Sequence, residues 1–115
     1  MEIQGVLDFG DLSNIKYISP YKEFDLTDIT LYIRLFYNLV DEHLYMDIYD
    51  ETETVLAYGI KLIPNVGLLK NIQYKLGVDT DIDIVVFSTT EANKYSEVTA
   101  DNIGEEMNIY YVKDV

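Results

Sequence analysis

Cysteine is absent from this chain of 115 residues. Its absence excludes a disulfide framework, a thiolate nucleophile and any zinc site with cysteine ligands. Histidine is scarce too, because His43 is the only one and it follows two acidic residues in a polar connection. A catalytic triad would have to be built around this one imidazole, and a general base in a turn would lack a pocket. We therefore expect His43 to be an exposed turn residue and the protein not to be an enzyme.

Long apolar runs and positive charge are also scarce. The longest apolar runs fall far short of the roughly 20 residues that a membrane-spanning helix needs, and the acidic start lacks the features of a signal peptide. The chain has 8 basic and 21 acidic residues and a formal charge of -13, which repels nucleic-acid phosphate and anionic membranes. We expect a soluble protein without direct nucleic-acid or membrane binding, while a basic protein partner stays possible.

What the chain does have is enough apolar material for a core. Hydrophobic residues make up 49% of the sequence and aromatic residues 13%, which is too much for a disordered acidic tail. A chain of this length has room for one core, and it shows no repeat, linker or low-complexity tract. We expect a single domain over residues 1–115.

The centre of the chain has the period of β-strands. Residues 29–37 alternate between apolar and more polar positions, 44–50 do the same after a polar connection, and 54–62 follow a second acidic turn. This pattern predicts a three-stranded antiparallel meander. Gly59 lies inside the third run and indicates a bulge or a close backbone approach.

The flanking segments are less regular. Residues 63–77 contain Pro64 and Gly67, and we expect irregular chain with about one helical turn. The β-branched run at 82–88 predicts a strand covered on both faces, and 107–112 predicts a closing strand after a polar loop at 89–101. Short strands are expected near 15–18 and 24–26. The sum is a mainly β fold of about six mostly antiparallel strands, in a sandwich or small barrel, with at most one short helical segment.

The sequence contains no complete motif for binding a metal ion or a phosphate group. Asp79, Asp81 and Asp83 alternate as at the start of a calcium-binding loop. The match ends there, because the sixth position is Ile84 rather than glycine and the twelfth is Thr90 rather than glutamate. No glycine-rich phosphate loop occurs. We expect solvated carboxylates at a strand entry, no metal site, no cofactor and no catalytic residue.

The 11 tyrosines are the most suggestive polar feature. Tyrosine is enriched in protein interfaces because it joins a large apolar ring to a hydroxyl that tolerates a wet boundary. Tyr45 and Tyr49 lie opposite the apolar side of their predicted strand, and Tyr110 and Tyr111 face opposite sides of the last one. We take Tyr45, Tyr49 and Tyr110 as candidate interface residues. Most of the other tyrosines are explained as ordinary strand formers at the margins of a core.

A turn motif precedes the last strand. Thr99 or Asp101 can accept hydrogen bonds from backbone amides of a single turn, and Asn102 and Gly104 complete it, the glycine in a left-handed conformation. Local structure alone explains this motif.

Several short pieces, taken in order, resemble a known family. They are Met46-Asp-Ile-Tyr-Asp50, Val55-Leu-Ala-Tyr-Gly59, Lys61-Leu-Ile-Pro-Asn-Val-Gly-Leu-Leu69, the strand 82–87, and the stretch Val98-Thr-Ala-Asp-Asn-Ile-Gly104 before 107–112. Together they resemble the small baseplate plug proteins of contractile-tailed phages, typified by a cyanophage plug. The resemblance runs from Thr30 to Val112, and residues 89–97 and the N-terminal twenty or so look like elaborations.

The resemblance implies a structural virion component made in the host cytoplasm. It implies a place near the tail axis, where the tube meets the baseplate hub, with tube, hub and wedge proteins as partners and several copies around the axis. It carries no catalytic residues. In a headless contractile bacteriocin the same plug could serve without any DNA. The acidity fits a tail channel, because an anionic lining repels DNA over about 10 Å, and it also fits docking to a basic neighbour.

A second reading is a small acidic inhibitor that mimics DNA and occupies a basic site on a nucleic-acid enzyme. Such mimics space carboxylates over much of one surface, and acidic residues here crowd the turns at 41–42, 50–53, 79–83 and 105–106. Solvated turns explain the same clusters, because the strands between them are well patterned.

Overall fold

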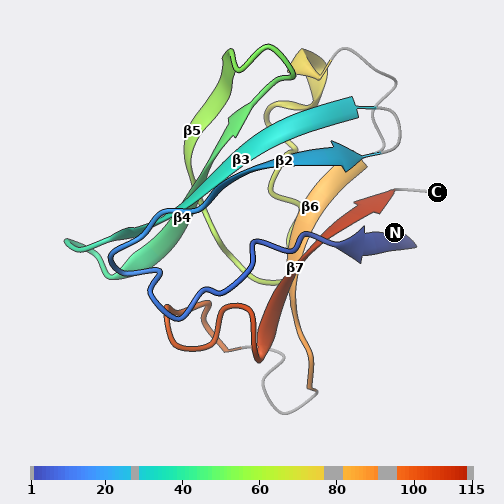
Figure 1. The fold of residues 1–115 in the computed structure, drawn as a ribbon. Helices are drawn as coiled ribbons and strands as arrows, with labels where there is room; N and C mark the ends of the chain where they lie inside the picture. Colours follow the sequence, from blue (N-terminus) through green and yellow to red (C-terminus); the bar gives the residue numbers. More distant parts are fainter. Residues whose placement is uncertain (1, 27–28, 77–81, 91–95, 114–115) are drawn as a thin grey trace.

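The computed structural model describes residues 2–26, 29–76, 82–90 and 96–113. They form seven strands in two antiparallel sheets that stack as an open sandwich (Figure 1). The strands are β1 (Glu2–Val6), β2 (Tyr21–Leu26), β3 (Ile29–Asn38), β4 (His43–Tyr49), β5 (Val55–Lys61), β6 (Ile82–Ser88) and β7 (Met107–Lys113). Within the described ranges the helical structure is one 3-10 helix, η1 (Gln73–Lys75). The predicted fold class is confirmed, with a sandwich rather than a closed barrel.

The larger sheet has the strand order β2-β3-β4-β5, so each strand pairs with its neighbour in sequence. The predicted meander is therefore confirmed as β3, β4 and β5. Gly59 lies in the predicted bulge: Met46 pairs with Ile60 and Ile48 with Ala57, so β5 advances three residues while β4 advances two. Gly59 has a φ of 66°, which L side chains rarely adopt and glycine adopts readily.

The smaller sheet has the order β1-β7-β6 and joins the two ends of the described chain. Glu2 pairs with Lys113, and Figure 1 shows β1 and β7 side by side. The sequence did not predict β1, and this strand raises the number from about six to seven. Its residues carry little apolar alternation, and its pairing partner lies at the far end of the chain.

The inner faces of the sheets build one hydrophobic core because strand alternation sends every second side chain inward. The central members are between 0% and 3% exposed: Leu31, Ile33, Leu35, Leu44, Met46 and Ile48 from the larger sheet, and Ile82, Ile84, Val86, Met107 and Ile109 from the smaller. Burying one such side chain stabilises the fold by about 1.5–3 kcal/mol. The side chains that point away from this core lie on the outer faces of the two sheets.

The segment between β5 and β6 covers the outer edge of β6. The Asn65 N–H donates to the Val86 carbonyl and the Leu68 N–H to the Ile84 carbonyl, both at 2.9 Å. The segment is irregular apart from turns and η1, which confirms the prediction for 63–77 as far as residue 76, where the described part ends. Residues 82–86 are all buried, which confirms a strand covered on both faces.

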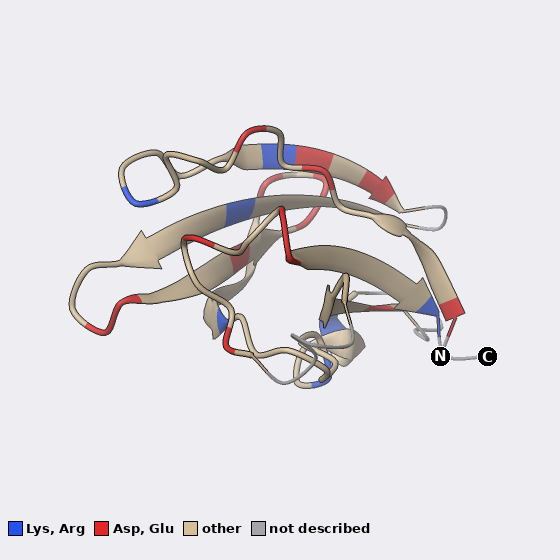
Figure 2. Ribbon diagram, turned by 90° about the horizontal axis from the view of Figure 1, so that it is seen from below, with Lys and Arg blue, Asp and Glu red and all other residues tan. Residues whose placement is uncertain are grey.

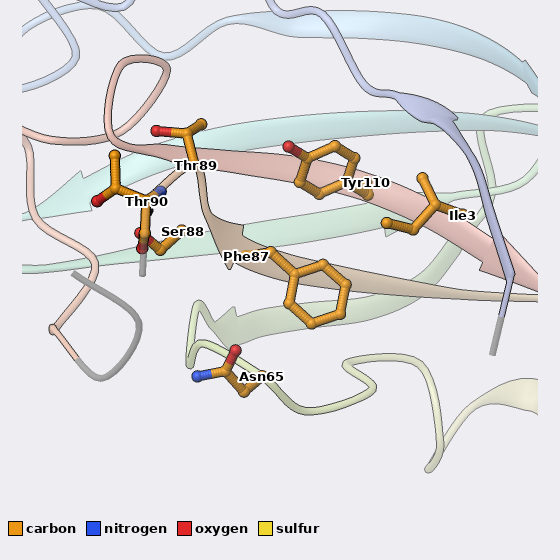
Figure 3. Close-up of a pocket in the computed structure, with 7 residues that line it drawn as sticks. All are labelled: Ile3, Asn65, Phe87, Ser88, Thr89, Thr90 and Tyr110. Carbon is orange, nitrogen blue, oxygen red and sulfur yellow. Dashed lines mark hydrogen bonds between the residues drawn. The ribbon is translucent and has the colours of Figure 1, made fainter. Parts of the chain in front are cut away.

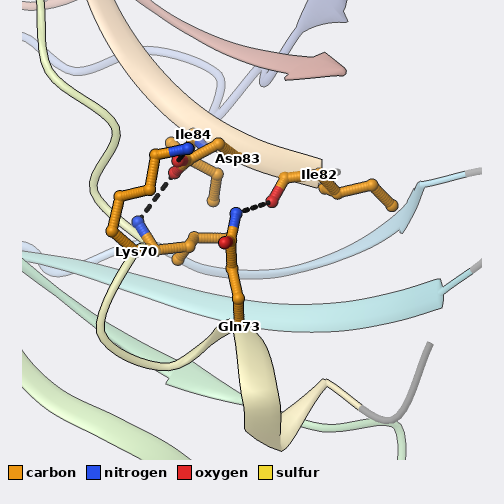
Figure 4. A network of polar contacts seen from close by, with 6 residues as sticks. Lys70, Gln73, Ile82, Asp83 and Ile84 are labelled. Carbon is orange, nitrogen blue, oxygen red and sulfur yellow. Dashed lines mark hydrogen bonds and ion pairs between the residues drawn. The ribbon is translucent and has the colours of Figure 1, made fainter. Parts of the chain in front are cut away.

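Asp83 of β6 binds the segment between β5 and β6 through hydrogen bonds and an ion pair (Figure 4). Its Oδ1 accepts hydrogen bonds from the backbone N–H groups of Leu69 at 2.7 Å and Ile84 at 2.8 Å, and Lys70 Nζ lies 3.4 Å from its Oδ2. Gly67 lies against the same carboxylate, since a Cβ at that position would be 2.2 Å from Oδ2. Asp83 is only 3% exposed, so the expectation of a solvated carboxylate is wrong for this residue, and its role is structural. Asp79 and Asp81 of the calcium-like fragment lie outside the described residues.

The prediction of a strand near residues 15–18 is wrong. Residues 13–17 form turns: the Asp11 carboxylate accepts from the Ser13 N–H at 2.9 Å, and the Asn14 carbonyl accepts from the Tyr17 and Ile18 N–H groups, each at 2.9 Å. Aspartate and asparagine satisfy nearby backbone groups and so favour turns over strands. The strand expected at 24–26 is the second half of β2.

Candidate interaction faces

The outer side of the larger sheet carries aromatic rings on all four strands. We call this surface the aromatic face; its rings are Tyr21 of β2, Tyr32 and Phe36 of β3, Tyr45 and Tyr49 of β4, and Tyr58 of β5. The register explains the grouping, because Tyr32 pairs with Tyr49 and Phe36 with Tyr45 across β3 and β4. Residues directly opposite on neighbouring strands point to the same side of a sheet.

Four of these tyrosines form a continuous row across the sheet. Tyr21 stacks on Tyr49 with ring centroids 5.6 Å apart and ring planes 10° apart, although β3 lies between their strands. Tyr32 meets Tyr21 edge-on at 5.6 Å, and Tyr58 meets Tyr49 edge-on at 6.3 Å. Tyr58 is 70% exposed and Tyr21 40%, so the row is a surface feature.

An arginine and a buried carboxylate lie beside this row. Arg34 Nη1 donates to Asp47 Oδ2 at 3.0 Å, and the guanidinium lies 4.8 Å from the centroid of the Phe36 ring. Phe36 in turn stacks on Tyr45 at 5.7 Å. Asp47 is only 5% exposed, and its other oxygen accepts the N–H of Gly59 at 2.8 Å.

Three tyrosine hydroxyls of the aromatic face donate to carboxylates. Tyr21 donates to Glu53 at 2.7 Å, Tyr32 to Glu23 at 3.1 Å, and Tyr45 to Asp41. Each bond fixes both the tilt of a ring and the position of a carboxylate. The face therefore combines apolar rings with negative oxygen atoms held at its margin.

The same surroundings raise the pKa of these tyrosines. Desolvation, followed by the bond to Glu53, raises the pKa of Tyr21 to about 12, and desolvation also raises the pKa of Tyr49. For Tyr32 and Tyr45 the hydrogen bond to a carboxylate is the largest cause of a raised pKa. All four hydroxyls stay neutral at physiological pH.

The outer side of the smaller sheet has a different surface (Figure 3). Phe87 and Tyr110 lie with ring centroids 5.9 Å apart, and Ile3 of β1, 55% exposed, lies beside them. They line an open hollow of about 450 Å³ whose other lining residues are Asn65, Ser88, Thr89 and Thr90. Tyr111 points the other way and packs against the core. We call this hollow the Tyr110 hollow.

A comparison with protein families decides what kind of protein carries these faces. The family model described as cyanophage baseplate Pam3 plug gp18 matches residues 12–114. The chain belongs to this baseplate plug family. Membership confirms the resemblance found in the sequence and implies a structural role in the virion baseplate, with other baseplate proteins as partners. The comparison with curated proteins gave no match.

The family match covers more of the plug than the sequence motifs did. It begins at residue 12 rather than at Thr30, so β2 and the turns before it belong to the family pattern and are not an elaboration. Residues 89–97 also lie inside the match.

The structure separates the predicted interface residues of the plug into two groups. Tyr45 and Tyr49 share the aromatic face, whereas Tyr110 lines the hollow on the other sheet. Sequence reasoning did not select Tyr21 or Tyr58 for this face. Tyr21 precedes the predicted strand at 24–26, and the bulge at Gly59 changes the alternation next to Tyr58.

The turn motif of the plug lies where β7 begins. Thr99 Oγ1 accepts from the N–H groups of Asp101 at 3.3 Å and Asn102 at 3.2 Å, and Asn102 Oδ1 accepts from the Thr99 N–H at 2.8 Å. Gly104 has a φ of 83°, and its N–H donates to the Met107 carbonyl at 2.7 Å. These bonds all serve local backbone geometry.

Other chemistry is sparse in the described part of the plug. No three His, Cys, Asp or Glu side chains there are placed to hold a metal ion together. The expectation that His43 is an exposed turn residue is wrong, because it is half-buried and begins β4. Its backbone N–H donates to Asp41 Oδ1 at 3.0 Å. Over the same ranges, no helix has the length and apolar character needed to cross a bilayer.

Proposed function

We propose that this plug protein is an adaptor near the tail axis that joins the tail tube to the baseplate hub. The observation that carries the proposal is the aromatic face, where tyrosines from four strands form an exposed row outside a complete core. Monomeric proteins rarely display such a surface without a partner, and tyrosine-rich patches are typical of interface centres.

The Tyr110 hollow supports the adaptor role because a joint between two proteins needs two contact surfaces. The aromatic face and the hollow lie on the outer sides of the two stacked sheets. In our proposal one face meets the tube and the other meets the hub or a wedge protein. Several copies surround the axis, and the protein performs no catalysis.

The acidity has a physical use at the tail axis. Figure 2 shows Asp and Glu spread over the connections and along β2 rather than confined to one side. An anionic surface beside the channel would repel DNA phosphates over about 10 Å, while carboxylates elsewhere would suit a basic neighbour.

The same distribution gives little support to the DNA-mimic alternative. Several turn carboxylates bind their own backbone: Asp8 accepts from the Gly10 N–H at 2.8 Å, Asp41 from the His43 N–H at 3.0 Å, and Asp50 from the Thr52 N–H at 2.9 Å. These groups already have a local structural use, as expected of solvated turns.

The test is to place a photo-crosslinking residue at one exposed position on each face. Tyr58 is 70% exposed on the aromatic face, and Ile3 is 55% exposed at the hollow. Purified tail particles are irradiated, and mass spectrometry identifies the crosslinked proteins and counts the plug against a hub protein. We expect a few copies per particle and a different tail protein crosslinked from each position.

Two results would contradict the proposal. One is the absence of the chain from tail particles. The other is its recovery with a host nuclease in salt-sensitive complexes, which would favour the mimic instead. A crosslinker at Tyr17, which is 85% exposed in the turns before β2, serves as the matched control for non-specific capture.

A further inference from the structure

We propose that the aromatic face binds an arginine side chain presented by a partner protein. The binding surface is formed by the rings of Tyr21, Tyr49 and Tyr58, with the Glu53 carboxylate at its margin. This inference rests on the proposed function, which makes the aromatic face a contact surface, and it adds the chemistry that the partner must supply.

The aromatic face already binds one guanidinium group of its own chain through an aromatic ring and a carboxylate. Arg34 lies 4.8 Å from the Phe36 centroid and pairs with the Asp47 carboxylate at 3.0 Å. One aromatic ring and one carboxylate thus hold a planar cation on this sheet. Guanidinium groups stack on aromatic rings and pair with carboxylates because their charge is delocalised over a weakly hydrated plane.

The neighbouring row of tyrosines also combines aromatic rings with a carboxylate. Tyr21 and Tyr49 stack, Tyr58 stands at 81° to Tyr49, and the Tyr21 hydroxyl holds Glu53 at 2.7 Å. In the part of the chain that the structure describes, no Lys or Arg pairs with Glu53 or lies over these three rings. The row therefore offers ring surface and negative charge to a cation from outside.

The net charge and the arginine content of this chain indicate which kind of protein binds the aromatic face. A protein with a formal charge of -13 attracts a basic partner and repels an acidic one. A second copy of the chain is a poor candidate, because Arg34 is its only arginine and is already held on its own sheet. The geometry points to a different protein with an exposed arginine, rather than to self-association.

The test uses the purified full chain and two synthetic peptides. One peptide carries three arginines separated by glycine and serine, and the other carries lysines at the same positions. Binding is followed at low ionic strength by NMR of the tyrosine rings and the backbone. We expect the largest shifts at Tyr21, Tyr49 and Tyr58, and tighter binding of the arginine peptide than of the lysine peptide.

Variants separate ring contacts from simple charge attraction. Tyr58→Ser should weaken binding of the arginine peptide by about two- to fivefold, the range expected for one exposed cation–π contact. Tyr17→Ser and Tyr74→Ser remove tyrosines that are 85% and 79% exposed outside the aromatic face, and they should leave binding unchanged. Glu53→Gln should weaken binding more than Glu105→Gln, which removes the same charge from an exposed turn.

Three results would overturn the inference: no binding, equal affinity for the two peptides, or shifts spread evenly over the acidic turns. Tyr58 is largely exposed, and the mapping with the unaltered chain needs no variant, so a folding defect cannot obscure the outcome. If the peptide test fails while crosslinking still places the aromatic face against a tail protein, the adaptor proposal stands and only the arginine assignment falls.

Discussion

Arg34 and Asp47 face each other across β3 and β4 and form an ion pair of 3.0 Å beside the row of tyrosines. The second oxygen of Asp47 accepts the N–H of Gly59 at the bulge of β5. One buried carboxylate therefore connects three strands beneath the surface that we assign to partner binding.

Replacing Asp47 with alanine should lower the free energy of unfolding by about 1–3 kcal/mol, because the Gly59 N–H loses its acceptor and Arg34 its counter-charge. Urea denaturation measures the change. Asp47→Asn keeps an acceptor oxygen and should cost less. Asp25→Ala, at an exposed position on β2, is the matched control and should change stability by no more than about 0.5 kcal/mol. Equal stability of Asp47→Ala and Asp25→Ala would contradict the structural role of Asp47.

Replacing Gly67 with alanine should destabilise the fold by about 1–3 kcal/mol, because the new methyl group would overlap the Asp83 carboxylate. The same substitution at Gly59 meets no atom within 4 Å and is opposed only by its positive φ, so its cost should stay at about 1–2 kcal/mol.

A double-mutant cycle tests whether Asp83 is the cause. In an Asp83→Ala background the carboxylate is gone, and Gly67→Ala should then cost much less than in the unaltered chain. Thermal or urea unfolding of the four proteins gives the coupling. Strictly additive effects would show that the crowding at Gly67 comes from another group.

Alkaline pH should weaken the fold through the tyrosines of the aromatic face. A group whose pKa is raised on folding contributes stability that is complete below its unfolded pKa and is lost as the pH passes its folded pKa. For Tyr21 this window runs from the ordinary value of 10.0 to about 12. Tyr32, Tyr45 and Tyr49 shift in the same direction.

The free energy of unfolding should therefore fall as the pH rises through this window. For Tyr21→Phe it should fall less steeply than for the unaltered chain. Tyr17→Phe removes an exposed tyrosine outside the face and should leave the slope unchanged. If Tyr21→Phe left the slope of the free energy of unfolding against pH unchanged, Tyr21 would bind its proton equally well in the folded and unfolded states.

Replacing both Tyr45 and Tyr49 with serine should reduce incorporation into tail particles more than it reduces stability. Both rings are half-buried, so a modest loss of thermal stability is expected as well. Particle content by mass spectrometry and the unfolding midpoint of the purified chain separate the two effects, with the pair Tyr17→Ser and Tyr74→Ser as control. Unchanged incorporation at unchanged stability would remove these residues from the interface.

The meander could be predicted from the sequence because its information is local. The alternation over 29–37 and 44–50 matches β3 and β4 to within one residue at every end. The first strand could not be predicted, since Glu2–Val6 is a strand through its pairing with β7 at the other end of the chain. At 15–18 apolar residues suggested a strand, but the hydrogen bonds of Asp11 and Asn14 favoured turns.

The candidate site was predictable only in part for a similar reason. Alternation within one strand is enough to place Tyr45 and Tyr49 together on the face away from the core. It cannot tell which residues of other strands join them, because that depends on the register between β2 and β3 and on the bulge in β5. Tyr21 and Tyr58 entered the aromatic face through these long-range pairings.

The pairing of Glu2 with Lys113 also has a consequence for the order of folding. The larger sheet is built from successive hairpins within residues 21–61, and these can close early because their contacts are short in sequence. The smaller sheet must wait for β7, which is synthesised after the other six strands. A nascent or C-terminally shortened chain would therefore expose the edge of β1 and the inner side of the meander together. We expect such chains to be the form of this protein most prone to aggregation and most dependent on chaperones.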